Sequence, residues 1–378
     1  MPDLKFLHTS DLQLGMRRWF LSDEDQANFD AARLEALTTL GQLAEEHGAE
    51  FIVIAGDVFE HNSLSNRVIE RVKEQLRRLK VPVYLLPGNH DPLVADNVFL
   101  RTEDLDGVHV LSDNRPVKVR EGVEVVGAPW RSKAPVGDLV AEMLSDLEPT
   151  DNIRIGVAHG QVESRSQEIV PGLIDLETVE KAIAERRLDY LALGDTHSTQ
   201  SLGATGRVWF SGAPETTDFA EPGGGGEADS GNALLVTVQK GEEVRVDVDK
   251  LPMGRWTFEA LADDLYDRAD VDAFLARLDA YPEKTTTVIK YALTGTLSLS
   301  DTRYLHEELS RRADVFGALY ERVRLMNLHL QPGEEEIEDL ELGGVAGAAL
   351  QELLDDREQP GRQDAINLLF RLAQEVAN

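Results

Sequence analysis

The chain has 378 residues, which is more than one hydrophobic core usually holds, so we expect two or three domains. It contains no cysteine, which excludes disulfides and thiolate metal ligands and favours a reducing compartment, the cytoplasm. The formal net charge of −31 argues against an affinity for nucleic acid that rests on phosphate neutralisation. We expect no signal peptide and no membrane-spanning segment.

The first hundred residues alternate strand-like apolar runs with helical stripes. Residues 4–8, 51–55 and 83–86 are apolar runs of strand length, and residues 23–46 and 68–79 carry apolar side chains at helical spacing. Strands that alternate with helices are typical of crossover units and a largely parallel sheet.

Beyond residue 108 the predicted strands become shorter and more frequent. They fall at residues 117–119, 123–126, 153–158, 188–193, 208–210, 233–238 and 244–248. Together with the earlier elements they predict an α/β fold, a two-layer mixed β-sheet sandwich flanked by helices. Residues 221–231 include four consecutive glycines and predict a mobile loop.

A different pattern begins at Trp256. Residues 257–261, 286–293 and 316–323 predict strands, and residues 271–281 and 302–312 predict helices, which together form a small α+β domain. An acidic linker follows Pro332, and two short helices are predicted at 345–354 and 365–376. The second has an apolar face made of Ile366, Leu369, Phe370, Ala373 and Val376, which must pack on its own chain or on a partner. The predicted domains are residues 1–252, 253–331 and 332–378.

Polar side chains follow five of the predicted strands. These side chains are Asp11, Asp57, Asn89, His159 and His197. Ligands collect at the carboxyl ends of strands in α/β sheets, so we expect these groups to lie together. Oxygen and nitrogen donors of this kind suit Mn²⁺, Fe²⁺ or Zn²⁺ better than soft metals. A pair of such ions about 3.5–4 Å apart stabilises the entering and leaving oxygens of an in-line phosphoryl displacement.

The motifs that hold these residues resemble those of the calcineurin-like metallophosphoesterases, and within that superfamily the SbcD-type DNA-repair exonucleases. They are His8-Thr9-Ser10-Asp11, Gly56-Asp57, Gly88-Asn89-His90-Asp91, His159-Gly160 and Gly194-Asp195-Thr196-His197. The resemblance covers roughly residues 4–250. It implies that the small domain is a cap and that the terminal helices hold an SMC-like ATPase, and it is compatible with a homodimer.

Carried over residue by residue, the resemblance implies that Asp11 and His197 bind one metal ion and that Asn89 and His159 bind the other. Asp57 would bridge the two ions. His90 would steady the scissile phosphate and protonate the leaving oxygen, a role typically worth about 10²–10⁴-fold in rate. Asp91 would orient His90.

Two positions depart from the family pattern. The first motif usually reads Asp-x-His but here ends in Gln13, and the last usually reads Gly-His-x-His but here has Asp195. Asp195 supplies a carboxylate oxygen, whereas Gln13 offers only a neutral amide oxygen. We therefore expect a weaker first site and a pair of divalent ions biased toward Mn²⁺ or Mg²⁺, with Fe²⁺ also suitable. A retuned site and a partly decayed one are both consistent with these changes.

The leading interpretation is a two-metal phosphodiesterase, a DNA exo- or endonuclease subunit that acts in DNA repair with an SMC-like ATPase. A hydrolase of small phosphodiesters or phosphomonoesters is the second interpretation, and the acidic charge favours it. The third is a non-catalytic scaffold with a lapsed metal site. The presence of His90 together with the predicted ligands argues against the scaffold.

Overall fold

The computed structural model describes residues 3–102, 104–162, 171–330, 344–355, 361, 365, 366, 368 and 369. The chain forms two compact units, Met1–Phe258 and Glu259–Asn378. The three-domain division with boundaries after residues 252 and 331 stays a prediction. No helix of the described residues is long and apolar enough to cross a membrane.

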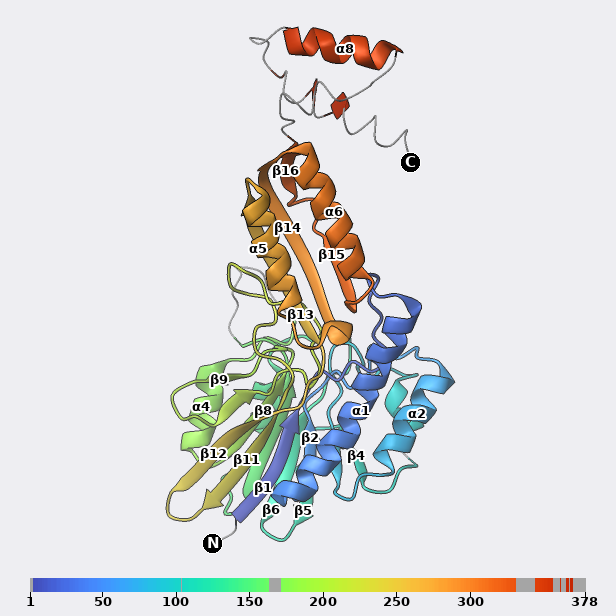
Figure 1. Ribbon diagram of the computed structural model, residues 1–378. Helices are drawn as coiled ribbons and strands as arrows, with labels where there is room; N and C mark the ends of the chain where they lie inside the picture. The colour runs from blue at the N-terminus through green and yellow to red at the C-terminus, as the bar shows by residue number, and fades with distance from the viewer. Residues whose placement is uncertain are drawn as a thin grey trace. The chain divides into compact units, whose positions relative to one another are not determined.

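The first sheet of the first unit carries the amino-terminal strands (Figure 1). Its strand order is β12-β11-β1-β2-β3-β4. Strands β1 to β4 are parallel to one another, and β11 pairs antiparallel with both β1 and β12. The strands are β1 (Asp3–Thr9), β2 (Ile52–Ile54), β3 (Val83–Leu85), β4 (Val108–Val110), β11 (Asn232–Lys240) and β12 (Val244–Pro252).

The second sheet has the strand order β5-β6-β7-β8-β10-β9. Four central strands are parallel, and the edge strands β5 and β9 are antiparallel to their neighbours. The strands are β5 (Val117–Arg120), β6 (Val123–Ala128), β7 (Ile153–His159), β8 (Tyr190–Gly194), β9 (Gln200–Leu202) and β10 (Val208–Phe210). The predicted mixed two-layer fold is therefore confirmed.

The sandwich forms because its strands alternate their side chains between two apolar surroundings. In β1, Phe6 packs between the sheets with residues such as Ile155, whereas Leu7 packs on the outer side with α1 and α2. The helices α1 (Asp23–His47) and α2 (Asn66–Leu76) cover the first sheet, and α3 (Leu139–Ser145) and α4 (Leu176–Ala184) pack on the second. The short helix η1 (Val98–Arg101) follows β3 in the chain.

Helix α1 begins and ends where its sequence signals predict. The Ser22 side chain accepts a hydrogen bond from Asp25 N, and three acidic residues in the first turn complement the helix dipole. Gly48 ends the helix with φ 69°, a left-handed conformation that glycine adopts without steric cost. The length of α1 fixes where the chain returns to the sheet as β2.

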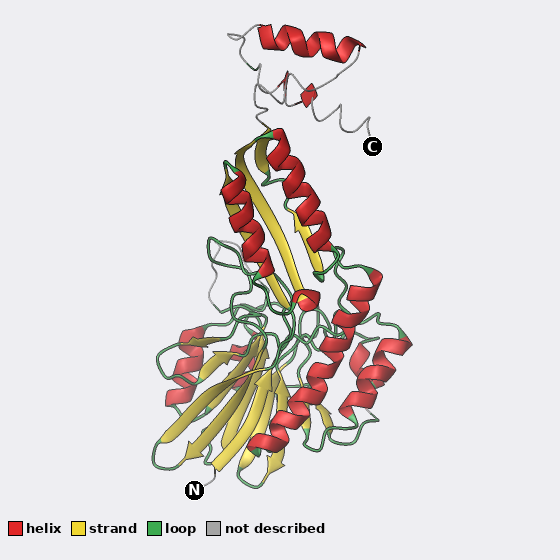
Figure 2. Cartoon of the chain, viewed as in Figure 1, coloured by secondary structure: helices red, strands yellow, loops and turns green. Residues whose placement is uncertain are grey.

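The second unit is a four-stranded sheet with two helices on one face (Figure 2). Its elements are β13 (Thr257–Leu265), α5 (Arg268–Asp279), η2 (Lys284–Thr286), β14 (Thr287–Leu297), α6 (Leu299–Ala313), β15 (Ala318–Glu321) and β16 (Asn327–Leu330). Apolar side chains of α5, α6 and the strands form its core. Strand β16, with alternating polar and apolar residues, was not among the predicted strands.

The structure confirms the first predicted terminal helix, as α8 (Gly344–Asp355). Leu350 of α8 and Ile366 are buried against Leu299 at the start of α6, with Leu369 packed on the same cluster. Part of the predicted apolar face therefore packs on its own chain. Residues 370, 373 and 376 of that face, and the predicted linker at 333–336, lie outside the described residues.

Candidate metal centre

The carboxyl ends of strands from both sheets meet at one place. Asp11, Asp57 and Asn89 follow β1, β2 and β3, which are neighbours in the first sheet, while His159 ends β7 of the second sheet. His159 Nδ1 donates a hydrogen bond to the Ala55 carbonyl oxygen at 2.9 Å, which joins the two sheets at this end. The ends of the parallel strands thus bring the predicted ligands together.

One half of the centre is formed by the side chains around His159. His159 Nε2 lies 2.7 Å from Asn89 Oδ1 and 3.4 Å from Asp57 Oδ2. Asp195 Oδ1 lies 3.8 Å from the same nitrogen. Ligand atoms of Asp11, Asp57 and His159 all lie within 4.8 Å of one another, and all three residues are buried. This grouping could hold metal, and it brings Asp11, which also lies near His197, close to Asp57 and His159.

The other half contains His197 and Asp11, and Gln13 follows Asp11 by two residues in the chain. His197 Nε2 lies 3.6 Å from Asp11 Oδ1. Gln13 is only 3% exposed, and its Oε1 has no hydrogen-bond partner among the described residues. A buried amide oxygen without a partner costs about 1–3 kcal/mol, and a bound cation would offset that cost. The residues present therefore fit a second metal ion in this half.

The backbone at the centre adopts conformations that side chains rarely tolerate. Among the described non-glycine residues with positive φ are Asp11 at 53°, Gln13 at 41°, Asp57 at 50° and Asp195 at 101°. Such conformations cost on the order of 1–3 kcal/mol each and persist only where the surrounding structure imposes them. All four are predicted metal-site residues, so the strain coincides with the site.

Two glycines are required because the ligands approach them closely. A Cβ on Gly56 would lie 2.2 Å from His159 Nδ1, and a Cβ on Gly88 would lie 2.2 Å from Asp57 Oδ1. Neither contact is sterically possible without displacing a ligand. The motif glycines therefore provide space as well as turn geometry.

The buried carboxylates attract positive charge to the centre. Burial lowers the pKa of His159, but the carboxylates of Asp57, Asp11 and Asp195 outweigh it and hold that pKa well above its usual value. Burial likewise lowers the pKa of His197, yet Asp11 and Glu227 raise it to about 9. Without metal ions, protons supply the positive charge, so protons and metal ions compete for the two imidazoles.

Asp57 and Asp195 respond differently to their burial. Burial alone raises the pKa of Asp57, but the cationic His159 beside it holds that pKa below its usual value. The pKa of Asp195 stays raised, because burial is the larger effect and His159 only partly offsets it. The Asp57 carboxylate is therefore available to bind cations at neutral pH.

Glu227 is a supporting residue that the sequence did not reveal. Its Oε2 lies 3.2 Å from His197 Nδ1, its Oε1 accepts from Thr217 N at 2.7 Å, and the residue is 6% exposed. A carboxylate on the second ring nitrogen fixes the orientation of a metal-binding histidine and raises its basicity. Glu227 lies in the loop 221–231, which has three acidic residues, and nothing in the sequence distinguishes it from the other two.

The contacts of His90 differ from those expected. His90 Nδ1 donates to the Glu60 carbonyl oxygen at 2.9 Å, and Glu60 Oε2 lies 3.8 Å away. The oxygens of Asp91 instead accept from Gly88 N at 2.7 Å and Phe59 N at 2.9 Å. Asp91 thus holds the turn, and these contacts do not support its expected orienting role toward His90. The roles of His90 and Asp91 in hydrolysis stay predictions.

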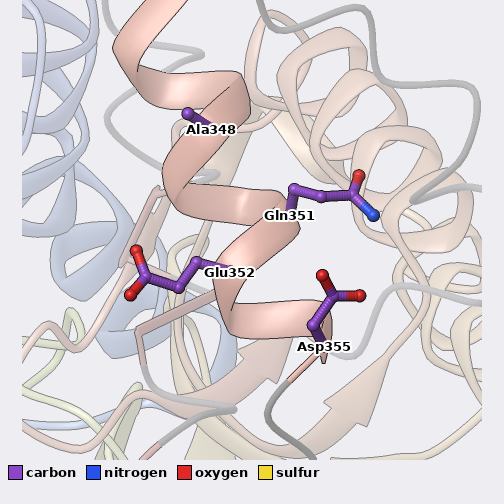
Figure 3. A pocket seen from close by; sticks show the side chains of 4 residues that line it. All are labelled: Ala348, Gln351, Glu352 and Asp355. Carbon is purple, nitrogen blue, oxygen red and sulfur yellow. The ribbon is translucent and has the colours of Figure 1, made fainter.

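A separate hollow lies along α8 in the second unit (Figure 3). It is lined by Ala348, Gln351, Glu352 and Asp355, which all come from that one helix. It contains no histidine and no residue of the five motifs. The centre described above therefore remains the candidate functional site.

Comparison with known proteins identifies the class of this protein. Residues 4–224, more than half of the chain, match the family model described as calcineurin-like phosphoesterase. The chain belongs to this family, which confirms the predicted superfamily and places the chain in a class of metal-dependent phosphoesterases.

The individual relatives point further. The chain is 28% identical over 204 residues to the DNA double-strand break repair protein Mre11 of Sulfolobus acidocaldarius, covering 50% of this chain and 51% of that protein. It is 28% identical over 243 residues to the Mre11 of Archaeoglobus fulgidus, covering 58% and 52%. It is 25% identical over 219 residues to the uncharacterized metallophosphoesterase YhaO of Bacillus subtilis, covering 54% and 51%. The chain spans about half the length of these relatives.

Proposed function

We propose that this chain is a two-metal-dependent phosphodiester hydrolase that acts on DNA. The observation that carries the proposal is the grouping of Asp11, Asp57 and His159, whose ligand atoms lie within 4.8 Å of one another. Family membership over residues 4–224 supports the same chemistry. Two residues of this grouping, Asp11 and Asp57, also have a strained backbone with positive φ, which is typical of functional sites.

The ligands would divide between two ions that share Asp57. Asp11, Gln13 and His197 would hold one ion, and Asn89, His159 and Asp195 would hold the other. When bound, the two ions would supply positive charge and Lewis acidity for attack of water on the phosphorus. Oxygen donors dominate this set, so we propose Mn²⁺, with Mg²⁺ or Fe²⁺ as substitutes.

His90 is the proposed general acid. Its backbone N–H donates to Asp57 Oδ1 at 3.0 Å, which ties the residue to the proposed bridging carboxylate. Its Nδ1 donates to the Glu60 carbonyl, which leaves Nε2 as the nitrogen that can meet the phosphate and transfer a proton to the leaving oxygen. Its side chain is 36% exposed, so a substrate can reach it.

DNA is the proposed substrate class because two relatives are named as DNA double-strand break repair proteins. The net charge of −31 keeps a second candidate in view, a small phosphodiester or phosphomonoester. An acidic protein repels a polyanion at long range, whereas a small phosphoester carries little charge. Catalysis on DNA by this chain would thus need either a basic partner or a local binding site for the nucleic acid.

The proposed partner is an SMC-like ATPase that binds the terminal helices. The burial of Ile366 in its own chain leaves a smaller free face than the sequence predicts. A homodimer and a cytoplasmic location stay predictions.

A substrate panel tests the proposed function. Hydrolysis of single-stranded DNA, double-stranded DNA and a chromogenic phosphodiester would be measured with Mn²⁺, Mg²⁺ or Zn²⁺, and with a chelator. We expect Mn²⁺-dependent cleavage of DNA that Asp57→Ala abolishes, a control that excludes a contaminating nuclease. Cleavage of the chromogenic substrate alone would favour the small-substrate candidate, and no metal-dependent cleavage of any substrate would favour a scaffold.

A further inference from the structure

The loop that leaves the metal centre carries an unusually exposed aromatic side chain. Trp19 is 83% exposed, six residues after Gln13. The side chain of Arg17 is 76% exposed and forms a long, solvent-accessible ion pair of 3.9 Å with Asp23. A single exposed ring is not a contiguous apolar patch of the kind that protein partners bury. An aromatic ring beside a cation is the composition of a nucleic-acid contact.

The loop is fixed rather than frayed. Gln26 of α1 is 4% exposed, and its Oε1 accepts from Arg18 N at 2.8 Å while its Nε2 donates to the Met16 carbonyl at 3.0 Å. Leu21 N donates to the Arg18 carbonyl at 3.2 Å. Trp19 is thus presented to solvent by backbone that is hydrogen-bonded on both sides of it.

An aromatic cluster supports the exposed ring from below. The Trp19 ring centroid lies 5.7 Å from that of Phe20 in an edge contact. Phe20 makes edge contacts of 5.6 Å with Phe219 and with Phe258, and Phe258 stacks on Phe29 at 5.6 Å. Ring pairs in these geometries stabilise their arrangement beyond simple burial. The Trp19 ring is therefore held in place by packed aromatic side chains.

The same loop is joined to the metal centre. The Arg18 guanidinium donates to the Thr217 carbonyl, and the Thr217 hydroxyl contacts His197 Nδ1. On α1, Arg33 lies over the Phe29 ring at 5.1 Å and donates to the Leu12 carbonyl in the first motif. Six residues span at most about 20 Å, so Trp19 lies within that distance of Gln13.

We propose that Trp19, with Arg17 beside it, is a stacking platform for an unpaired base of a single-stranded nucleic acid held at the metal centre. This inference rests on the proposed function. Stacking suits this chain because it does not depend on net charge, and a chain of charge −31 gains little from phosphate neutralisation. Every base has an aromatic face, so the platform would hold a strand without selecting its sequence.

The test measures binding of a phosphorothioate oligothymidylate to the full-length chain with Mg²⁺ present, by anisotropy of a label on the oligonucleotide. We expect Trp19→Ala to weaken binding by about tenfold to a hundredfold and Trp19→Phe to retain most of the affinity. Arg17→Ala should reduce the slope of log affinity against log salt by about 0.7, whereas Trp19→Ala should leave the slope unchanged. Trp209→Phe, on β10, is the matched control and should bind like wild type.

Intrinsic fluorescence gives an independent readout, because Trp130 and Trp256 are only 4% and 3% exposed. The oligonucleotide should quench wild type and Trp209→Phe, and quenching should fall sharply in Trp19→Ala. If Trp19→Ala binds the oligonucleotide with unchanged affinity, the proposal that Trp19 stacks on a base is wrong, even if the protein cleaves DNA. A Trp19→Ala variant that keeps its affinity but no longer self-associates would assign the ring to a contact between copies and would also overturn it. Failure of wild type to bind or cleave any DNA would instead contradict the proposed function.

Discussion

In the half of the metal centre that contains His159, Nε2 already lies 2.7 Å from Asn89 Oδ1 and 3.4 Å from Asp57 Oδ2. In the half that contains His197, Gln13 Oε1 is buried without a partner among the described residues. Both histidines have their second ring nitrogen fixed, His159 by the Ala55 carbonyl and His197 by Glu227. The halves therefore differ in their donors rather than in how their imidazoles are oriented.

From this difference we expect the substitution at Gln13 to weaken one site without abolishing it. A neutral amide oxygen is a poorer donor than the imidazole that the family pattern has at this position, but it can still bind a divalent ion. At the other departure, Asp195 adds a negative charge 3.8 Å from His159 Nε2. We therefore expect two ions of unequal affinity, with the tighter ion in the His159 half.

The largest effect is expected from a substitution that empties both halves of the metal centre. Asp57→Ala should release both ions and reduce hydrolysis to background, because it deletes the carboxylate that the halves share. Metal content of the dialysed protein and Mn²⁺-dependent hydrolysis would be measured together. Asp104→Ala, which removes a side chain 62% exposed and paired with Lys73, is the control and should behave like wild type. Retention of one tightly held ion in Asp57→Ala would show that the carboxylate does not bridge.

The next largest effect separates chemistry from coordination. His90→Ala should keep both ions but lose about 10²–10⁴-fold in turnover, because the proposed role of His90 is proton transfer. The neighbouring His61→Ala should retain full turnover. Metal analysis beside steady-state kinetics provides the check, and metal loss in His90→Ala comparable to that in Asp57→Ala would contradict the assigned role.

A smaller effect should fall on one half alone. Glu227→Gln should weaken the ion in the His197 half by about 10–100-fold, because the carboxylate orients that imidazole and raises its basicity. The ion in the His159 half should be unaffected. Mn²⁺ titration would measure both affinities, with the exposed Glu242→Gln as control. Equal weakening of the two ions would mean that Glu227 supports the centre as a whole.

A substitution that strengthens the weaker half should make the metal affinities of the two halves more similar. Gln13→His should tighten the weaker ion and shift its preference toward Zn²⁺, because imidazole is a stronger donor than a neutral amide. Competition between Mn²⁺ and Zn²⁺ would show the shift. Unchanged affinity would mean that Gln13 is not a ligand.

The smallest effect is expected from a change that touches neither half. Removal of residues 334–378 should leave hydrolysis of a small phosphodiester unchanged, because every proposed ligand precedes Thr199. It should abolish binding to an SMC-like ATPase. Since Leu350 and Ile366 are buried against Leu299, it should also lower the melting temperature of the second unit. A truncated protein that is insoluble would show that these helices belong to the core of their own chain and would remove the main support for the partner.

The motif positions could be predicted from sequence because each ligand follows an apolar strand of ordinary length. Asp11 follows β1 and Asp57 follows β2, and a parallel sheet places those ends together. The supporting groups could not be predicted in this way. Glu227 reaches His197 from an irregular loop thirty residues later, and no periodicity marks such a contact.

Some contacts differ from those that adjacency in the sequence leads one to expect. Asp91 directly follows His90, yet its oxygens accept backbone hydrogen bonds from Gly88 and Phe59. The group beside His90 Nδ1 is the carbonyl of Glu60, which lies in another motif. The positive φ of Asp11 and Asp57 could not be predicted either, because in a sequence glycine is the residue that indicates this conformation.

Equilibrium dialysis of the full-length protein against Mn²⁺ tests the central claim most directly. The account predicts two ions per chain with distinct affinities, and it predicts that Gln13→His raises only the weaker affinity. One ion per chain, or two ions of equal affinity that Gln13→His leaves unchanged, would contradict it.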